Sequence, residues 1–198
     1  MHRIALVALV LLGPFGAVAQ APYFPKGAFS EDSNSDRFKA EWYSTHLKAL
    51  NEPSLLQLAS KLSSESYRFV WLRTFHHPVV VRLDIRADRV GELTAKVSNG
   101  AGGYKPGQII QNVSRPLTRE QTNMFLAQVG RANFWQLPSY ENSRREGEDG
   151  SQWIIEGVKD GKYHVVDRWT PSEGPVRELG VTLALGLADL KIPKDDLY

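Results

Sequence analysis

The fold is decided by residues 153–169, which read WIIEGVKDGKYHVVDRW. Both ends of this stretch are rich in β-branched and aromatic residues, and Asp160-Gly161 lies between them. An Asp-Gly pair between two such runs is typical of a type I′ turn, because both central residues of that turn need a positive φ. The stretch therefore predicts an antiparallel hairpin with strands over residues 153–158 and 163–169.

The two-residue turn fixes which residues of the hairpin face each other. One face is predicted to carry the pairs Trp153–Arg168, Ile155–Val166 and Gly157–His164. The other face is predicted to carry Gln152–Trp169, Ile154–Asp167, Glu156–Val165 and Val158–Tyr163. On this second, more apolar face, Glu156 and Asp167 are diagonal neighbours about 7–8 Å apart along the backbone.

Four segments upstream alternate apolar and polar residues, as half-buried strands do. They are residues 67–75, 79–85, 93–97 and, with a weaker pattern, 109–113. Strands of this kind predict an antiparallel sheet with one face in contact with solvent.

Most of the remaining sequence of the domain shows helical periodicity. An apolar stripe runs along residues 36–50, and a second short helix is expected directly after it. Residues 118–131 begin with the Thr-x-x-Gln spacing of a capping box, and a last helix begins at Pro175. Gly180 and Gly186 are expected to weaken that last helix by about 1 kcal/mol each relative to alanine. The sum is an α+β fold: an antiparallel sheet of about six strands with helices packed on one face and an N-terminal helical pair.

The first 19 residues have the pattern of a secretory signal peptide. Arg3 precedes an unbroken apolar run over residues 4–12, and Ala17-Val18-Ala19 is a small-x-small cleavage site. The run is shorter than the roughly 20 residues that a membrane helix needs. We expect cleavage after Ala19 and an exported protein, either periplasmic or extracellular.

After the signal peptide, the sequence predicts a flexible leader over residues 20–35, one domain over residues 36–192 and a C-terminal tail over residues 193–198. The chain has no cysteine, which removes disulfides, thiol chemistry and Cys-ligated zinc. An exported chain without disulfides is more typical of bacteria than of eukaryotes.

The 24 Lys and Arg residues nearly balance the 22 Asp and Glu residues, for a net charge of +2. Loss of Arg3 with the signal peptide lowers this charge to about +1. A near-neutral chain argues against nucleic acid, which favours a basic stripe, and it offers no polybasic patch for anionic lipid. After signal cleavage no apolar run is long enough to span a membrane. The sequence leaves the oligomeric state open.

Glu156 and Asp167 are the first candidates for chemistry. If their face of the hairpin is the core face, burial raises the pKa of each carboxyl unless a cation offsets it. Paired carboxylates at this spacing can transfer protons or hold a divalent cation. The interpretation that we favour is a structural ion-pair network, with Arg73 and Arg82 as the cations. If the opposite face is buried instead, both acids are solvated.

His76 and His164 are the other catalytic candidates. His76 and His77 are adjacent in an extended segment before Pro78, so their side chains point to opposite faces and do not chelate one metal together. One of them could join His164 and a carboxylate in space to hold zinc. No spacing in the sequence supports that arrangement, and we predict neither a metal nor another cofactor.

The candidates for binding a ligand are largely aromatic. Trp153 opposite Arg168, with Trp169 beside them, could form a cation–π patch for a sugar or a peptide. Such a pair is more often a contact that stabilises the sheet by about 0.5–1 kcal/mol. The other two candidates are Arg73 and Tyr104. Tyr104 lies in a glycine-rich loop over residues 99–107, which lacks the Gly-Lys-Ser/Thr of a phosphate-binding loop.

Residues 67–78, which read YRFVWLRTFHHP, and residues 153–169 resemble exported bacterial proteins of unknown function. The resemblance covers roughly residues 36–192, implies a shared fold and an envelope location, and carries over no catalytic residue. We expect a non-enzymatic envelope domain that binds a protein or a glycan, with loops 99–107 and 138–150 beside the hairpin as its surface. The alternative is a hydrolase or metal-dependent enzyme that uses Glu156, Asp167 and either His164 or His76.

Overall fold

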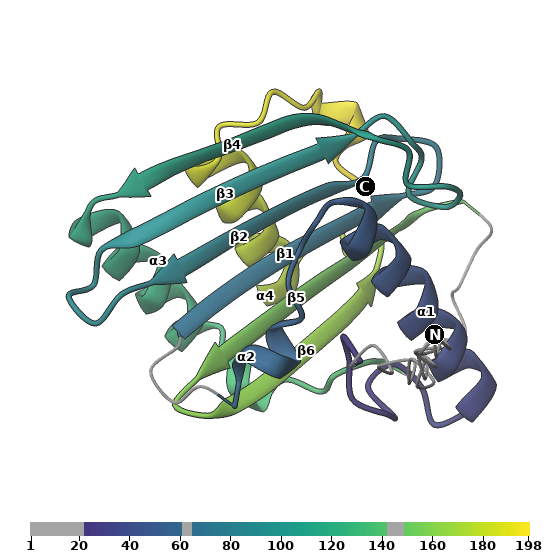
Figure 1. The fold of residues 1–198 in the computed structure, drawn as a ribbon, viewed down its shortest axis with the longest axis horizontal. Coiled ribbons are helices and arrows are strands. Elements are labelled where there is room, and N and C mark those ends of the chain that lie inside the picture. The colour runs from purple at the N-terminus through teal and green to yellow at the C-terminus, as the bar shows by residue number, and fades with distance from the viewer. Residues whose placement is uncertain (1–21, 61–64, 142–148) are drawn as a thin grey trace, which may run out of the picture.

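A computed structural model describes residues 22–60, 65–141 and 149–198. Its centre is a six-stranded antiparallel sheet in the order β4-β3-β2-β1-β5-β6 (Figure 1). The strands are β1 (Glu65–Arg73), β2 (Val79–Ile85), β3 (Gly91–Ser98), β4 (Ile109–Leu117), β5 (Ser151–Lys159) and β6 (Lys162–Trp169). The predicted α+β class and the six strands are confirmed.

The β5–β6 hairpin has the predicted register. Asp160 and Gly161 take positive φ values of 50° and 75°, as a type I′ turn requires. Trp153 pairs with Arg168 and Gln152 with Trp169, so every predicted cross-strand pair is present. The other edge of β5 pairs with β1, which places Arg68 directly opposite Glu156.

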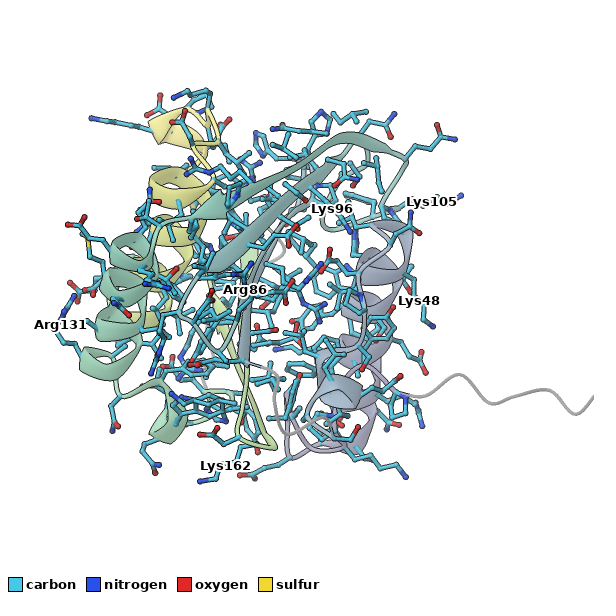
Figure 2. All side chains as sticks on the ribbon, turned by 60° about the vertical axis from the view of Figure 1, so that its left-hand side comes forward. Lys48, Arg86, Lys96, Lys105, Arg131 and Lys162 are labelled. Atoms are coloured by element: carbon cyan, nitrogen blue, oxygen red, sulfur yellow. The ribbon has the colours of Figure 1, made fainter. Side chains whose placement is uncertain are left out.

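Helices lie on both faces of the sheet (Figures 1 and 2). One face is covered by α3 (Arg119–Arg131), α4 (Pro175–Val181) and a π-helical turn over Thr182–Leu187. The opposite face is covered by α1 (Ser33–Ala49) and the short α2 (Leu55–Leu58). No helix in the described ranges is both long and apolar enough to cross a membrane.

The expectation of helices on one face and solvent on the other is therefore corrected. The α3–α4 side is a packed core, as expected, and the N-terminal helical pair makes a second core on the other side. The physical reason lies in β1 and β5, where Val70, Leu72 and Ile154 are apolar at the positions that alternate with the first core. Both faces of these two central strands must therefore be covered.

The predicted flexible leader is also corrected. Tyr23, Phe24 and Phe29 are buried, and the rings of Phe24 and Phe29 pack edge-to-face against Tyr43 of α1. The Asp36 carboxylate accepts the backbone N–H groups of Gly27 at 2.8 Å and Phe29 at 2.9 Å. The aromatic residues between the prolines and glycines give this segment enough apolar area to fold onto the domain.

Gly180 of α4 is required by packing rather than merely tolerated. A Cβ atom there would lie 2.8 Å from the Trp153 ring, whereas one at Gly186 would meet nothing within 4 Å. We expect Gly180→Ala to lower the free energy of unfolding by about 1–2 kcal/mol, because overpacking outweighs the gain in helix propensity. The matched variant Gly186→Ala should be neutral or stabilising. Urea denaturation of both variants tests this, and equal midpoints would contradict it.

Candidate functional site

Glu156 lies in a buried ion pair on the α1 side of the sheet. Its Oε2 accepts from Arg68 Nε at 2.7 Å and lies 2.6 Å from Arg68 Nη2, while Oε1 accepts from the Tyr163 hydroxyl at 2.9 Å. Burial raises the pKa of Glu156, and Arg68 and Tyr163 oppose that shift. The cation is therefore Arg68, and the prediction that Arg73 or Arg82 pairs with this acid is wrong.

The pair belongs to a larger group, the buried ion cluster, made of Glu52, Arg68, Arg82, Lys96 and Glu156. Glu52 lies 2.8 Å from Arg82 Nε, 2.6 Å from Lys96 Nζ and 3.5 Å from Arg68 Nη1. Burial alone would raise the pKa of Glu52, but these three cations outweigh burial and lower it. The cluster fastens the chain between α1 and α2 to β1, β2, β3 and β5.

Asp167 lies on the same face as Glu156 but belongs to a different network. Its Oδ2 accepts from Tyr43 Oη at 3.1 Å and from Lys39 Nζ at 3.3 Å, and both donors lie on α1. The face that the two acids share was predicted correctly. Each acid nevertheless has its own partners, so the structure does not bring the two carboxylates together as one site.

The two candidate histidines lie elsewhere. His164 is on the opposite face of β6, where its Nε2 is 3.0 Å from the Leu137 carbonyl oxygen. His76 follows β1 and contacts the C-terminal segment. The four catalytic candidates therefore do not converge. Among the described residues, no three His, Asp or Glu side chains are arranged to hold a metal ion.

The proposed Trp153–Arg168 patch takes a different form. Trp153 is fully buried, and the guanidinium over its ring is that of Arg177, 5.3 Å from the ring centroid. Arg168 instead binds the Pro138 carbonyl oxygen and Glu141. Cross-strand pairing alone does not decide which cation covers a ring, because α4 brings Arg177 to this core.

Tyr104 and Trp169 lie in different surroundings. Tyr104 is exposed and lies near Phe75, with ring centroids 6.2 Å apart. Trp169 lines a cleft of about 430 Å³ between α1 and the ends of β1, β5 and β6. The lining of this aromatic cleft includes Phe38, Lys39, Trp42, Thr74, Gln152 and Trp169. Of the predicted binding residues, Trp169 is the one that faces this space.

Three aromatic rings surround the aromatic cleft, and those of Trp42 and Trp169 are held by neighbouring groups. The Trp42 indole donates to the Gly102 carbonyl oxygen at 2.9 Å, and the Phe38 and Trp42 ring centroids are 6.0 Å apart. Trp169 rests on Gly150, where an added Cβ atom would lie 2.6 Å from the ring. Phe38 is 65% exposed, so an apolar ring is presented to solvent at the rim.

Gln152 is the polar residue of the aromatic cleft that lacks a full set of partners. Its side chain is only 6% exposed, and its Oε1 has no hydrogen-bond partner in the part of the chain that the structure describes. A buried acceptor without a donor costs about 1–3 kcal/mol. A ligand in the cleft that displaced the groups covering Oε1 and donated a hydrogen bond to it would remove that cost.

Part of the aromatic cleft was visible in the sequence. The pairing of Gln152 with Trp169 follows directly from the hairpin register. Phe38 and Trp42 were missed because they come from α1, and their exposure depends on how that helix docks. Of the predicted surface loops, Gly150 contributes to the lining, whereas residues 142–148 lie outside the described residues.

Comparison with known proteins gives no family for this chain. No protein-family model matches the sequence, and a search of curated proteins finds no significant match. The aromatic cleft is therefore interpreted from its own residues.

Proposed function

We propose that this protein is an exported, non-enzymatic module that binds a glycan in the aromatic cleft. The observation that carries the proposal is the buried, unpartnered Oε1 of Gln152 beside three aromatic rings. The cleft volume of about 430 Å³ is in the usual range for small-molecule sites, about 300–1,000 Å³.

The chemistry of the lining favours a sugar. A pyranose ring has an apolar C–H face, which packs on aromatic side chains, and an edge of hydroxyl groups, which pair with amides and hydroxyls. Phe38, Trp42 and Trp169 supply the rings, and Gln152 and Thr74 supply the polar groups. Because Lys39 is held 3.3 Å from Asp167, its charge is already balanced and the cleft suits a neutral ligand. An amide-bearing sugar offers an N–H donor for Gln152 Oε1.

The signal-peptide pattern and the lack of cysteine support a location in the periplasm or outside a bacterial cell, where envelope glycans are present. The charge distribution favours neither nucleic acid nor an anionic membrane. Lys48 and Lys105 lie on one side of the domain, whereas Arg131 projects from the opposite side and Lys162 from the bottom in this view (Figure 2). These cations do not form one stripe.

The enzymatic alternative receives less support from the geometry. Both Glu156 oxygens are engaged by Arg68 and Tyr163, so this acid has no free oxygen for a substrate proton. His164 lies on the other face of the sheet. A protein ligand in the aromatic cleft is the remaining alternative, and it is distinguished by the experiment below.

The test is titration of the chain from residue 20 onward with a trimer of N-acetylglucosamine, followed by calorimetry and tryptophan fluorescence. We expect Phe38→Ala to weaken binding at least tenfold, because it removes one ring of the cleft. The matched control is Phe75→Ala, since Phe75 is 59% exposed but lies outside the cleft lining. Gln152→Leu should weaken binding while the fluorescence change on saturation persists.

Two results would contradict the proposal. The first is no binding of the trimer or of other soluble envelope glycans at millimolar concentration. The second is an equal loss of affinity in Phe38→Ala and Phe75→Ala. Binding of a peptide but not of a sugar, with the loss confined to Phe38→Ala, would assign the aromatic cleft to a protein ligand instead.

A further inference from the structure

Two exposed aromatic side chains, Phe75 and Tyr104, border the aromatic cleft. Phe75 directly follows Thr74, which lines the cleft, and is 59% exposed, while Tyr104 is 65% exposed. Their ring centroids are 6.2 Å apart, and the two ring planes are inclined by 31°. We call this pair the aromatic platform. Exposed rings leave apolar area in contact with water, and a patch of them next to a cleft is typical of a binding surface.

The glycine-rich loop holds Tyr104 in this place. The Gly103 N–H donates to the Thr74 carbonyl oxygen at 3.1 Å, so the loop is bonded to the residue that lines the cleft. A Cβ atom at Gly102 would lie 2.5 Å from the backbone at the end of β1, so this close approach requires a glycine. The loop therefore fixes Tyr104 beside Phe75.

The same loop is bonded to α1, the helix that carries two rings of the cleft. The Trp42 indole, which lines the cleft, donates to the Gly102 carbonyl oxygen at 2.9 Å. Phe38 lies one turn before Trp42 along α1, and His46 lies one turn after it. Backbone groups of Gly102 and Tyr104 lie near His46. The exposed rings therefore follow one path along α1, from Phe38 past Trp42 to the aromatic platform.

This path is longer than the aromatic cleft and has the same chemical character. Phe38, Phe75 and Tyr104 are three of the six large apolar side chains that are exposed in the described part of the chain. Half of this set is thus gathered along the path. Neither ring of the platform is charged at neutral pH, and the Tyr104 hydroxyl can donate or accept a hydrogen bond.

A linear oligosaccharide matches this arrangement. Each pyranose unit repeats an apolar C–H face and an edge of hydroxyl groups, so successive units can pack on successive rings of the path. A short sugar that fills the cleft does not need the platform. A longer chain that leaves the cleft past Trp42 reaches Phe75 and Tyr104 next.

We propose that the ligand is a linear oligosaccharide longer than a trimer, whose first units fill the aromatic cleft and whose further units stack on Phe75 and Tyr104. This inference rests on the proposed glycan binding and adds the class of glycan: a linear polymer, or a long fragment of one, rather than a short free sugar. The aromatic platform increases the affinity for long chains and leaves the affinity for the trimer unchanged.

The experiment compares the trimer and the hexamer of N-acetylglucosamine by calorimetry, again with the chain from residue 20 onward. We expect the hexamer to bind at least tenfold more tightly than the trimer. Phe75→Ala and Tyr104→Ala together should reduce this gain to the small factor that the additional binding registers of a longer chain supply. The same double variant should bind the trimer as the unaltered chain does, because the cleft is intact.

Two further variants show whether the gain depends on the rings of the platform. Tyr104→Phe keeps the ring and should keep the gain. Met124→Ala is the matched control, since Met124 is also 65% exposed but lies on α3, away from the cleft lining, and should keep the gain as well. Circular dichroism establishes that every variant is folded.

The outcomes separate this inference from the proposed function. A trimer that binds and a hexamer that binds no more tightly would overturn the inference and leave glycan binding in the aromatic cleft standing. An equal gain in the platform double variant and in Met124→Ala would overturn it too. Failure of both oligosaccharides to bind would overturn the inference and the proposed function together.

Discussion

Arg68→Met is expected to lower the free energy of unfolding by about 3–5 kcal/mol, as removal of one partner from a buried ion pair does. The Arg68 side chain is fully buried and is the nearest cation to Glu156. Its loss leaves Glu156 in a low-dielectric site where the Tyr163 hydroxyl is the one remaining side-chain donor among the described residues, and it removes one of three cations around Glu52. Urea denaturation at neutral pH measures the loss.

Two further variants separate charge from packing. Adding Glu156→Gln to Arg68→Met removes the uncompensated charge and should recover part of the lost free energy, because the remaining cost is that of an imperfectly paired amide. Arg86→Met is the matched control, since Arg86 forms its ion pair with Asp88 at the surface and should leave the denaturation midpoint unchanged. Similar midpoints for Arg68→Met and Arg86→Met would show that the buried ion cluster does not stabilise the fold.

The incorrect prediction of Arg73 or Arg82 as the partner of Glu156 shows which contacts can be predicted from the sequence and which cannot. The hairpin register was predictable because Asp160-Gly161 specifies a turn of fixed length. The pairing of β5 with β1 was not predictable, because β1 lies far away in the sequence and strand order is a tertiary property. Alternation places Arg73 on the same face of β1 as Trp71. That this face is the α4 side, opposite Glu156, follows only from the pairing of β1 with β5.

The residues that α1 contributes to the aromatic cleft could not be predicted from the sequence for a related reason. The periodicity of α1 gives its buried stripe, and Tyr43 and Leu47 are indeed buried. It does not say which sheet face the helix covers, so Phe38 and Trp42 could not be placed beside Trp169. The C-terminal segment was predicted to be a tail because six residues without periodicity carry no folding signal. Its order comes instead from specific hydrogen bonds to Trp71, Trp153 and Ser151.

His46 should make the domain sensitive to acid well above the range in which most carboxyl groups titrate. The side chain is fully buried in α1, and burial lowers the pKa of His46 from 6.5 to about 4, while nearby backbone groups of Tyr104 and Gly102 partly oppose the shift. Below pH 6.5 the unfolded chain binds a proton that the folded chain does not. Stability is therefore complete above pH 6.5 and is lost as the pH falls toward 4.

The expected loss from His46 is about 2 kcal/mol between pH 7 and pH 5, and about 3 kcal/mol by pH 4. His46→Gln removes the titration. As the pH falls over this interval, the stability advantage of the unaltered chain over His46→Gln should therefore shrink or reverse. Taking the difference cancels the contributions of carboxyl groups such as Glu156, whose raised pKa acts in the opposite direction. The matched control is His77→Ala, because His77 is exposed. Parallel pH profiles for the unaltered chain and His46→Gln would mean that the buried imidazole binds its proton without opening the fold.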